Sequence, residues 1–153
     1  MDIWFYHLTR QPLDKVLPEL LERSARRGWK AVVQARSEER VRALDEWLWT
    51  FSNDSFLVHG TAADGDFEWQ QVYLTTGVEN PSGANARFFV ESAEIAPALA
   101  ESSAYERVVL IFDGNDPDEL QAARDQWRLL KGQGHALSYW KQTEGGGWEK
   151  MAI

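Results

Sequence analysis

Short apolar segments alternate with longer segments of helical periodicity throughout this 153-residue chain. Residues 3–8 are an apolar run of strand length, and in residues 13–28 leucine and valine recur at helical spacing before a terminal glycine. Residues 30–35 are a second strand-like run, after which Ser37 is a good N-cap for a helix that begins with two glutamates. This alternation predicts the α/β class, with helices packed around a mostly parallel central sheet.

The rest of the chain continues this pattern without a linker, an internal repeat or a low-complexity tract, so we expect one domain over residues 1–153. Pro18 is unusual inside the first helix and predicts a kink or a late start there. Residues 50–70 have the composition of a loop. The further predicted elements are strands over 71–76, 86–92 and 106–114, a short helix over 96–101, a long helix from Pro117 to near Gly132, and a closing hairpin over 134–142 and 147–152.

Acidic residues outnumber basic ones by 24 to 16, which gives a formal net charge of −8. The overall field should repel nucleic acid and anionic lipid unless a local basic patch overrides it, so we expect no direct nucleic-acid or membrane binding. The chain has no cysteine, which excludes disulfides, thiolate zinc sites and cysteine nucleophiles. No apolar run approaches the ~20 residues of a membrane span, and the first residues lack a signal-peptide pattern, so a cytoplasmic location is expected.

The turn after the first strand, residues 7–14, contains no glycine. Backbone amides can wrap closely around a pyrophosphate only where glycine lets the chain approach it, so this turn does not predict a phosphate-binding loop. We therefore expect no nucleotide cofactor and interpret the α/β fold as a scaffold. The alternative is a small enzyme or nucleotide-binding domain with a site at the strand ends near Asp113 and Asn115.

No catalytic or metal-binding constellation is evident. His7, His59 and His135 are far apart in sequence and lack the spacing of metal ligands. No nucleophile elbow is present, and scattered acidic pairs are expected in a chain of this charge. The sequence therefore predicts no metal, no cofactor and no catalytic activity of its own.

The long helix from Pro117 to Lys131 has an apolar stripe and a basic edge. Its predicted buried stripe is Leu120, Ala123, Trp127 and Leu130. Along one edge of the stripe recur Arg124, Arg128 and Lys131. Two interpretations remain open: a solvated face with cations near the negative helix end, or a receptor for an acidic peptide, which requires a basic rim beside apolar side chains.

The second helix ends in an aromatic segment. Leu48 completes its buried stripe, so Trp49 points about 100° away from that stripe. Trp47 faces a third direction, and at least one of these tryptophans is therefore expected to be partly exposed or to pack against another element.

Three segments together resemble the chi subunit family of bacterial DNA polymerase III holoenzyme. They are "FYHL" at residues 5–8, "LDEWLWTFSNDSFLVHG" at residues 44–60 and "VVLIFDGNDPDELQAARDQWRLLKGQGHALSYWKQ" at residues 108–142. The similarity covers nearly the whole chain in the same order. It implies a non-catalytic replisome adaptor with a Rossmann-like, three-layer α/β sandwich that lacks a phosphate-binding loop.

The resemblance also implies the partners. Chi proteins bind the acidic, phenylalanine-ended C-terminal tail of single-stranded DNA-binding protein, and some bind a psi subunit that connects them to the clamp loader. By motif match, Trp49 and Arg124 fall on the tail-binding pocket, with Phe112 as a further wall. Arg128 and Lys131, on the same helix edge as Arg124, are expected to supply positive charge at the rim.

A different surface of the family binds psi, another clamp-loader component or a helicase-like repair protein. Phe56, with His59 in the same segment, falls on that surface. The chain departs from the family at Leu120 and Gln121, where some relatives carry a lysine. We therefore expect tail binding to depend more on Arg124 and Arg128, or to be weaker.

Overall fold

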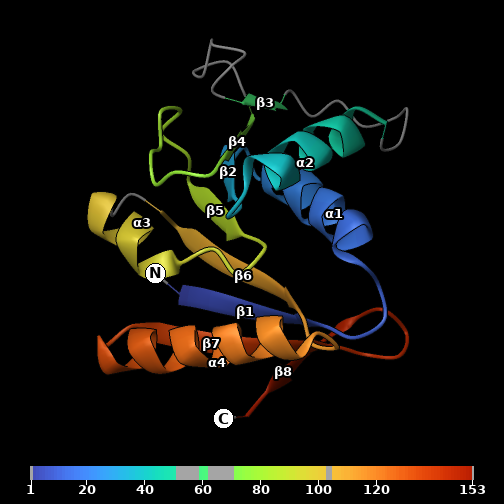
Figure 1. Cartoon of the computed structure of the whole chain (residues 1–153), viewed down its shortest axis with the longest axis vertical. Coiled ribbons are helices and arrows are strands. Elements are labelled where there is room, and N and C mark those ends of the chain that lie inside the picture. The colour runs from blue at the N-terminus through green and yellow to red at the C-terminus, as the bar shows by residue number, and fades with distance from the viewer. Residues whose placement is uncertain (1, 51–58, 62–70, 103–104, 153) are drawn as a thin grey trace.

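The computed structural model describes residues 2–50, 59–61, 71–102 and 105–152, which fold into an α/β structure (Figure 1). The strands in this part of the chain are β1 (Asp2–Leu8), β2 (Ala31–Gln34), β3 (His59–Thr61), β4 (Val72–Thr75), β5 (Ala86–Phe89), β6 (Arg107–Asp113), β7 (Ala136–Gln142) and β8 (Trp148–Met151). The helices are α1 (Leu13–Arg26), α2 (Glu38–Thr50), α3 (Ile95–Glu101) and α4 (Pro117–Gly132).

The strands form one sheet in the order β3-β4-β2-β5-β6-β1-β7-β8. Every neighbouring pair is parallel except β7 and β8, which form an antiparallel hairpin at one edge. The register places Phe5 of β1 beside Leu110 of β6 and Tyr139 of β7. The predicted α/β class, the mostly parallel sheet and the closing hairpin are confirmed.

Helices pack on both faces of the sheet. On one face, buried residues of α1 and α2 join alternate residues of the strands in one hydrophobic core. On the other face, a second core joins residues of α3 and α4 to the intervening strand residues. Strands buried on both faces are typical of parallel sheets, and this explains their nearly continuous apolar runs. Within the described ranges, no helix is long and apolar enough to cross a membrane.

Two expectations about local structure are wrong. Residues 50–70 were expected to form a loop, but His59–Thr61 form β3. This strand has only three residues and contains a glycine, so its sequence shows no alternation of apolar and polar residues that would predict a strand. It forms through parallel pairing with β4.

Pro18 was expected to cause a kink or a late start of the first helix, and the late start is wrong, because α1 begins at Leu13, well before Pro18. Proline has no N–H to donate to the carbonyl four residues earlier, which is that of Asp14. In the fold, the indole N–H of Trp47 on α2 donates to this carbonyl instead. The Trp47 side chain is 38% exposed, as expected for at least one tryptophan of this segment.

Candidate functional site

A cavity of about 370 Å³ lies between α4 and the carboxyl-terminal halves of β1, β6 and β7, beside the end of β8. We call it the α4 pocket. It is lined by His7, Phe112, Leu120, Ala123, Arg124, Trp127, Arg128, Tyr139, Lys141, Met151 and Ala152.

The floor of the α4 pocket is apolar and aromatic. Phe112 and Ala123 are buried, and Trp127 and Tyr139 pack against the same core. The Tyr139 ring is edge-on both to Phe112, at 6.0 Å between centroids, and to Trp127, at 5.9 Å. Edge-to-face packing holds these rings in fixed positions. The floor can therefore receive an apolar side chain without rearrangement of the core.

The rim of the α4 pocket is cationic. Arg124, Arg128 and Lys141 are exposed, and the described lining residues include no aspartate or glutamate. Arg128 has a 3.7 Å ion pair with Asp125 on the surface of α4, which at this exposure contributes little. Neither Arg124 nor Lys141 makes a salt bridge with a carboxylate in the part of the chain described. The rim thus provides positive charge that an anionic ligand can neutralise.

His7 lies at the inner end of the pocket. Its Nδ1 is 2.6 Å from the Tyr139 hydroxyl, and a side chain at Gly114 would overlap its ring. Burial, and then the positive charge of Lys141, lower the pKa of His7, so that the imidazole is neutral at pH 7. Burial likewise raises the pKa of Tyr139. Both groups therefore act as neutral hydrogen-bonding walls.

The structure brings together three of the residues selected from the sequence, namely Phe112, Arg124 and Arg128. Lys131 is exposed in the last turn of α4 but does not line the pocket. Lys141 was missed, because it is on β7 and reaches the site only through the pairing of β7 with β1, where it lies beside His7.

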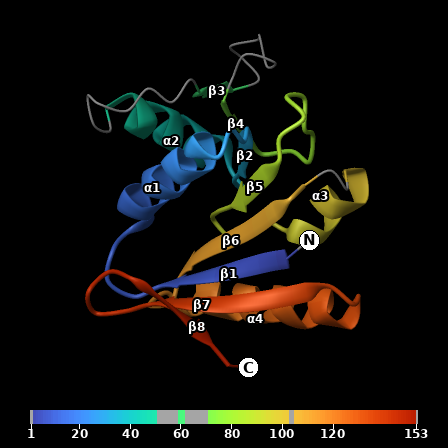
Figure 2. The same cartoon turned by 180° about the vertical axis from the view of Figure 1, so that it is seen from behind.

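Trp49 is not among the described residues that line this pocket. Its backbone belongs to α2, which packs on the opposite face of the sheet from α4, and its side chain lies outside the described residues. Figures 1 and 2 show α2 and α4 at opposite ends of the molecule. The expectation of a single pocket between Trp49 and Arg124 therefore stays a prediction, because the position of the Trp49 side chain decides it. Phe56 lies outside the described residues, as does the side chain of His59, whose backbone is in β3.

The turn between β1 and α1 is filled by the protein itself. The side-chain Oε1 of Gln142 accepts hydrogen bonds from the backbone N–H groups of Thr9 at 3.3 Å, and of Arg10 and Gln11 at 2.9 Å each. Successive N–H groups that converge on one point form the kind of nest that binds an anion. Here the side-chain amide oxygen of the buried Gln142, at the end of β7, occupies that position.

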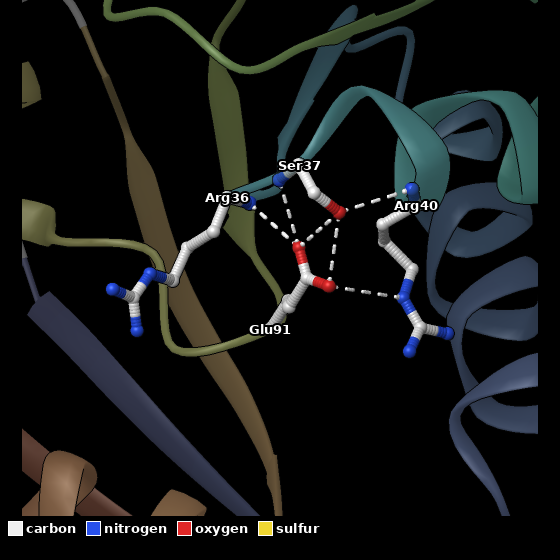
Figure 3. A network of polar contacts seen from close by, with 4 residues as sticks. All are labelled: Arg36, Ser37, Arg40 and Glu91. Atoms are coloured by element: carbon white, nitrogen blue, oxygen red, sulfur yellow. Dashed lines mark hydrogen bonds and ion pairs between the residues drawn. The ribbon is translucent and has the colours of Figure 1, made fainter.

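A second potential anion site, at the start of α2, is filled in the same way (Figure 3). The Glu91 carboxylate accepts from the backbone N–H of Arg36 at 3.0 Å and from that of Ser37 at 2.9 Å, and also from the Ser37 hydroxyl. It makes a 3.8 Å ion pair with Arg40. The Ser37 hydroxyl accepts from the backbone N–H of Arg40, which confirms Ser37 as the N-cap. A carboxylate thus takes the place that a phosphate would need at this helix N-terminus.

A cavity of about 610 Å³ opens at these strand ends, where the alternative enzyme site was expected. Its lining mixes arginines with carboxylates. Asp113 accepts a hydrogen bond from the backbone N–H of Asn115, and the Asn115 amide donates to the Thr9 carbonyl, so both residues hold the turn. Over the described residues, no group of three or more histidine, aspartate or glutamate side chains is placed to hold a metal ion.

The protein is thus of the α/β class, and side chains of its own occupy the two places where such a fold could bind a phosphate, the β1–α1 turn and the start of α2. Its α4 pocket combines an aromatic floor with a cationic rim. Residues 1–138 match the family model described as "DNA polymerase III chi subunit, HolC". The chain is 24% identical over 150 residues to the probable DNA polymerase III subunit chi of Rickettsia prowazekii, which covers 96% of this chain and 90% of that protein. It is 26% identical over 124 residues to the DNA polymerase III subunit chi of Pseudomonas aeruginosa, covering 80% of this chain and 82% of that protein.

The chain therefore belongs to the family of the chi subunit of DNA polymerase III. This family membership assigns it an accessory role in DNA replication.

Proposed function

We propose that this chi subunit binds the acidic C-terminal tail of single-stranded DNA-binding protein in the α4 pocket. The observation that carries the proposal is the combination of an aromatic floor with a rim of three cations, without a carboxylate among the lining residues that the structure describes. A tail that ends in phenylalanine presents a ring, a terminal carboxylate and preceding aspartates. Each of these groups has a complementary group in the pocket.

The terminal ring fits against Phe112, Trp127 and Tyr139, which are already fixed in the core. Its carboxylate can reach Arg124 or Lys141, whose positive charges meet no carboxylate within the described residues. A charge-assisted hydrogen bond to a guanidinium is about twice as strong as a neutral one. The preceding aspartates need only diffuse positive charge, which Arg128 and Lys131 can supply.

The second part of the proposal is that the segment of Phe56 and His59 binds psi, another clamp-loader component or, alternatively, a repair helicase. β3, which begins at His59, is at the opposite edge of the sheet from the hairpin that borders the α4 pocket. Two partners bound at these places would not overlap. This separation supports a role as an adaptor that links coated single-stranded DNA to the clamp-loader assembly.

Titration of a fluorescent acidic peptide ending in phenylalanine tests the pocket. Arg124→Ala and Lys141→Ala should each weaken binding by tenfold or more, whereas Lys131→Ala should mainly change the salt dependence. Arg26→Ala, which removes an exposed arginine from α1 on the other face, is the control. If both the Arg124 and the Lys141 variants bound the peptide with wild-type affinity, the proposal that the tail binds in this pocket would be contradicted.

Phe56→Ala tests the second surface. It should leave peptide affinity unchanged and weaken binding of the clamp-loader-side partner, because losses at binding hot spots are local. Loss of peptide binding in this variant, with the fold intact, would contradict two separate sites.

A further inference from the structure

None of the described helices covers the outer part of the α1-side face of β1, β7 and β8. α1 lies farther in, near β6, and α4 covers the opposite face. Figure 2 looks onto this face, with α4 behind the sheet. Strand alternation presents Trp4 and Tyr6 of β1, Trp140 of β7 and Trp148 of β8 on this face.

These aromatic rings form a connected row. Trp4 is 5.2 Å from Trp140 and 6.1 Å from Tyr6 between centroids, and Trp148 stacks on Tyr6 at 4.5 Å. Trp29, just after α1, extends the row at the other end. The four tryptophans, Trp4, Trp29, Trp140 and Trp148, are only partly buried.

Cations alternate with the rings. The guanidinium of Arg107 lies 4.0 Å from the Trp4 ring and 5.4 Å from the Trp29 ring. Arg27 lies 5.1 Å from Trp29, and Lys150 lies 6.0 Å from Trp140. We call this surface the tryptophan-arginine face; its members are Trp4, Tyr6, Arg23, Arg27, Trp29, Arg107, Trp140, Trp148 and Lys150.

The positive charge of this face is not neutralised locally. Where the structure describes the chain, no carboxylate is within salt-bridge distance of Arg23, Arg27, Arg107 or Lys150. A cavity of about 150 Å³ lies between the three arginines, walled by Trp4 and Trp29. Burial and, second, the neighbouring charge of Arg27 lower the pKa of Arg107, while Tyr6 and, to a smaller extent, Asp2 act in the opposite direction. An anion placed between these arginines would relieve their repulsion.

We propose that the tryptophan-arginine face binds a short stretch of single-stranded nucleic acid. Tryptophan rings receive bases by stacking without regard to sequence, and the interleaved cations receive the phosphates. The row crosses β6, β1, β7 and β8, a distance of roughly 14 Å at about 4.8 Å per strand, which suits a site of a few nucleotides. An acidic peptide would use the arginines but leave most of the aromatic row unused.

The net charge of −8 does not oppose this binding at short range. At about 0.15 M salt the Debye length is about 8 Å, so acidic residues elsewhere on the surface are largely screened from this face. The local patch therefore overrides the overall charge, which was the one condition left open in the sequence analysis.

The test is the anisotropy of a fluorescein-labelled oligothymidylate of about 12 nucleotides, titrated with the whole 153-residue chain between about 20 and 150 mM salt. If three phosphates are neutralised by the three arginines, the slope of log affinity against log salt should be about −2. The double variant Arg23→Glu/Arg27→Glu should lose tenfold or more in affinity. Both side chains are exposed, so folding should be retained.

Arg26→Glu is the matched control, because Arg26 is on the same helix but reaches toward Glu22 and does not line the cavity. It should remain within twofold of wild type. Trp29→Ala should lose at least fivefold if a base stacks there. Arg124→Ala, in the α4 pocket, should not change oligonucleotide affinity.

Three outcomes would overturn the proposal. The first is no binding by the wild type at the lowest salt. The second is equal losses in the Arg26→Glu and Arg23→Glu/Arg27→Glu proteins, which would indicate nonspecific attraction. The third is displacement by a polyglutamate peptide with no effect of Trp29→Ala, which would indicate an acidic protein partner.

Discussion

Removal of the Gln142 side chain should measure how much the filled turn between β1 and α1 contributes to stability. Gln142→Ala leaves the N–H groups of Arg10 and Gln11 without their 2.9 Å acceptor, and that of Thr9 without its 3.3 Å acceptor. Each hydrogen bond contributes about 1 kcal/mol net, and water can replace part of it in this partly buried turn. We therefore expect a loss of about 2 kcal/mol in the free energy of unfolding. For a chain of this size, that corresponds to a decrease in Tm of roughly 4–8 °C.

Urea unfolding followed by tryptophan fluorescence, together with thermal scans, would measure this loss. Gln133→Ala is the control, because Gln133 is exposed and its substitution removes no comparable hydrogen-bond acceptor. The vacated nest should also become an anion site, so phosphate should raise the Tm of Gln142→Ala more than that of the wild type. A variant as stable as the control, with no added response to phosphate, would refute the interpretation of Gln142 as an internal substitute for an anion.

Three further results are expected. Trp47→Phe should lower the free energy of unfolding in urea by about 1 kcal/mol, because it leaves the Asp14 carbonyl without a donor. The loss should be smaller in a Pro18→Ala background, where the backbone N–H of residue 18 can donate to that carbonyl, and equal losses in the two backgrounds would contradict this explanation. Burial, and then the hydrogen bond to a glutamate, raise the pKa of Tyr73 to about 12 from 10.0, so stability present below pH 10 should decrease as the pH rises toward 12, which unfolding at stepped pH would show. The pKa of His7 is lowered, so the unfolded chain takes up its proton first, and wild-type stability should fall below pH 6.5 more steeply than that of His7→Gln in the same assay.

Elements with several agreeing local signals were predictable from the sequence. Asp116 caps α4 by accepting from the N–H groups of Asp118 and Glu119, and Pro117 occupies the first helical position. Each of these signals acts within one turn, so the sequence alone contains it. β3 depends instead on pairing with β4, which is a tertiary contact.

Only those parts of the candidate site that lie on a single helix or strand could be predicted from the sequence. The period of α4 places Arg124 and Arg128 along one edge, and the end of β6 presents Phe112 nearby. Lys141 comes from β7, and strand register cannot be read from a single strand. The assignment of Trp49 to this pocket could not come from α2 alone, because helical periodicity shows that a helix has a buried stripe but not which face of the sheet the stripe covers.

The two proposed sites use opposite faces of the same strands. On β1 and β7, His7, Tyr139 and Lys141 face α4, while Trp4 and Trp140 face the other side. An acidic tail and a nucleic-acid strand would therefore be separated by the sheet and would share no contact residue. Both ligands are anionic, but sites on the two sides of a sheet are farther apart than about one Debye length at 0.15 M salt, so their mutual repulsion is weak. The geometry thus allows one chi subunit to bind the tail of single-stranded DNA-binding protein and a neighbouring stretch of single-stranded nucleic acid at the same time, with nearly independent affinities.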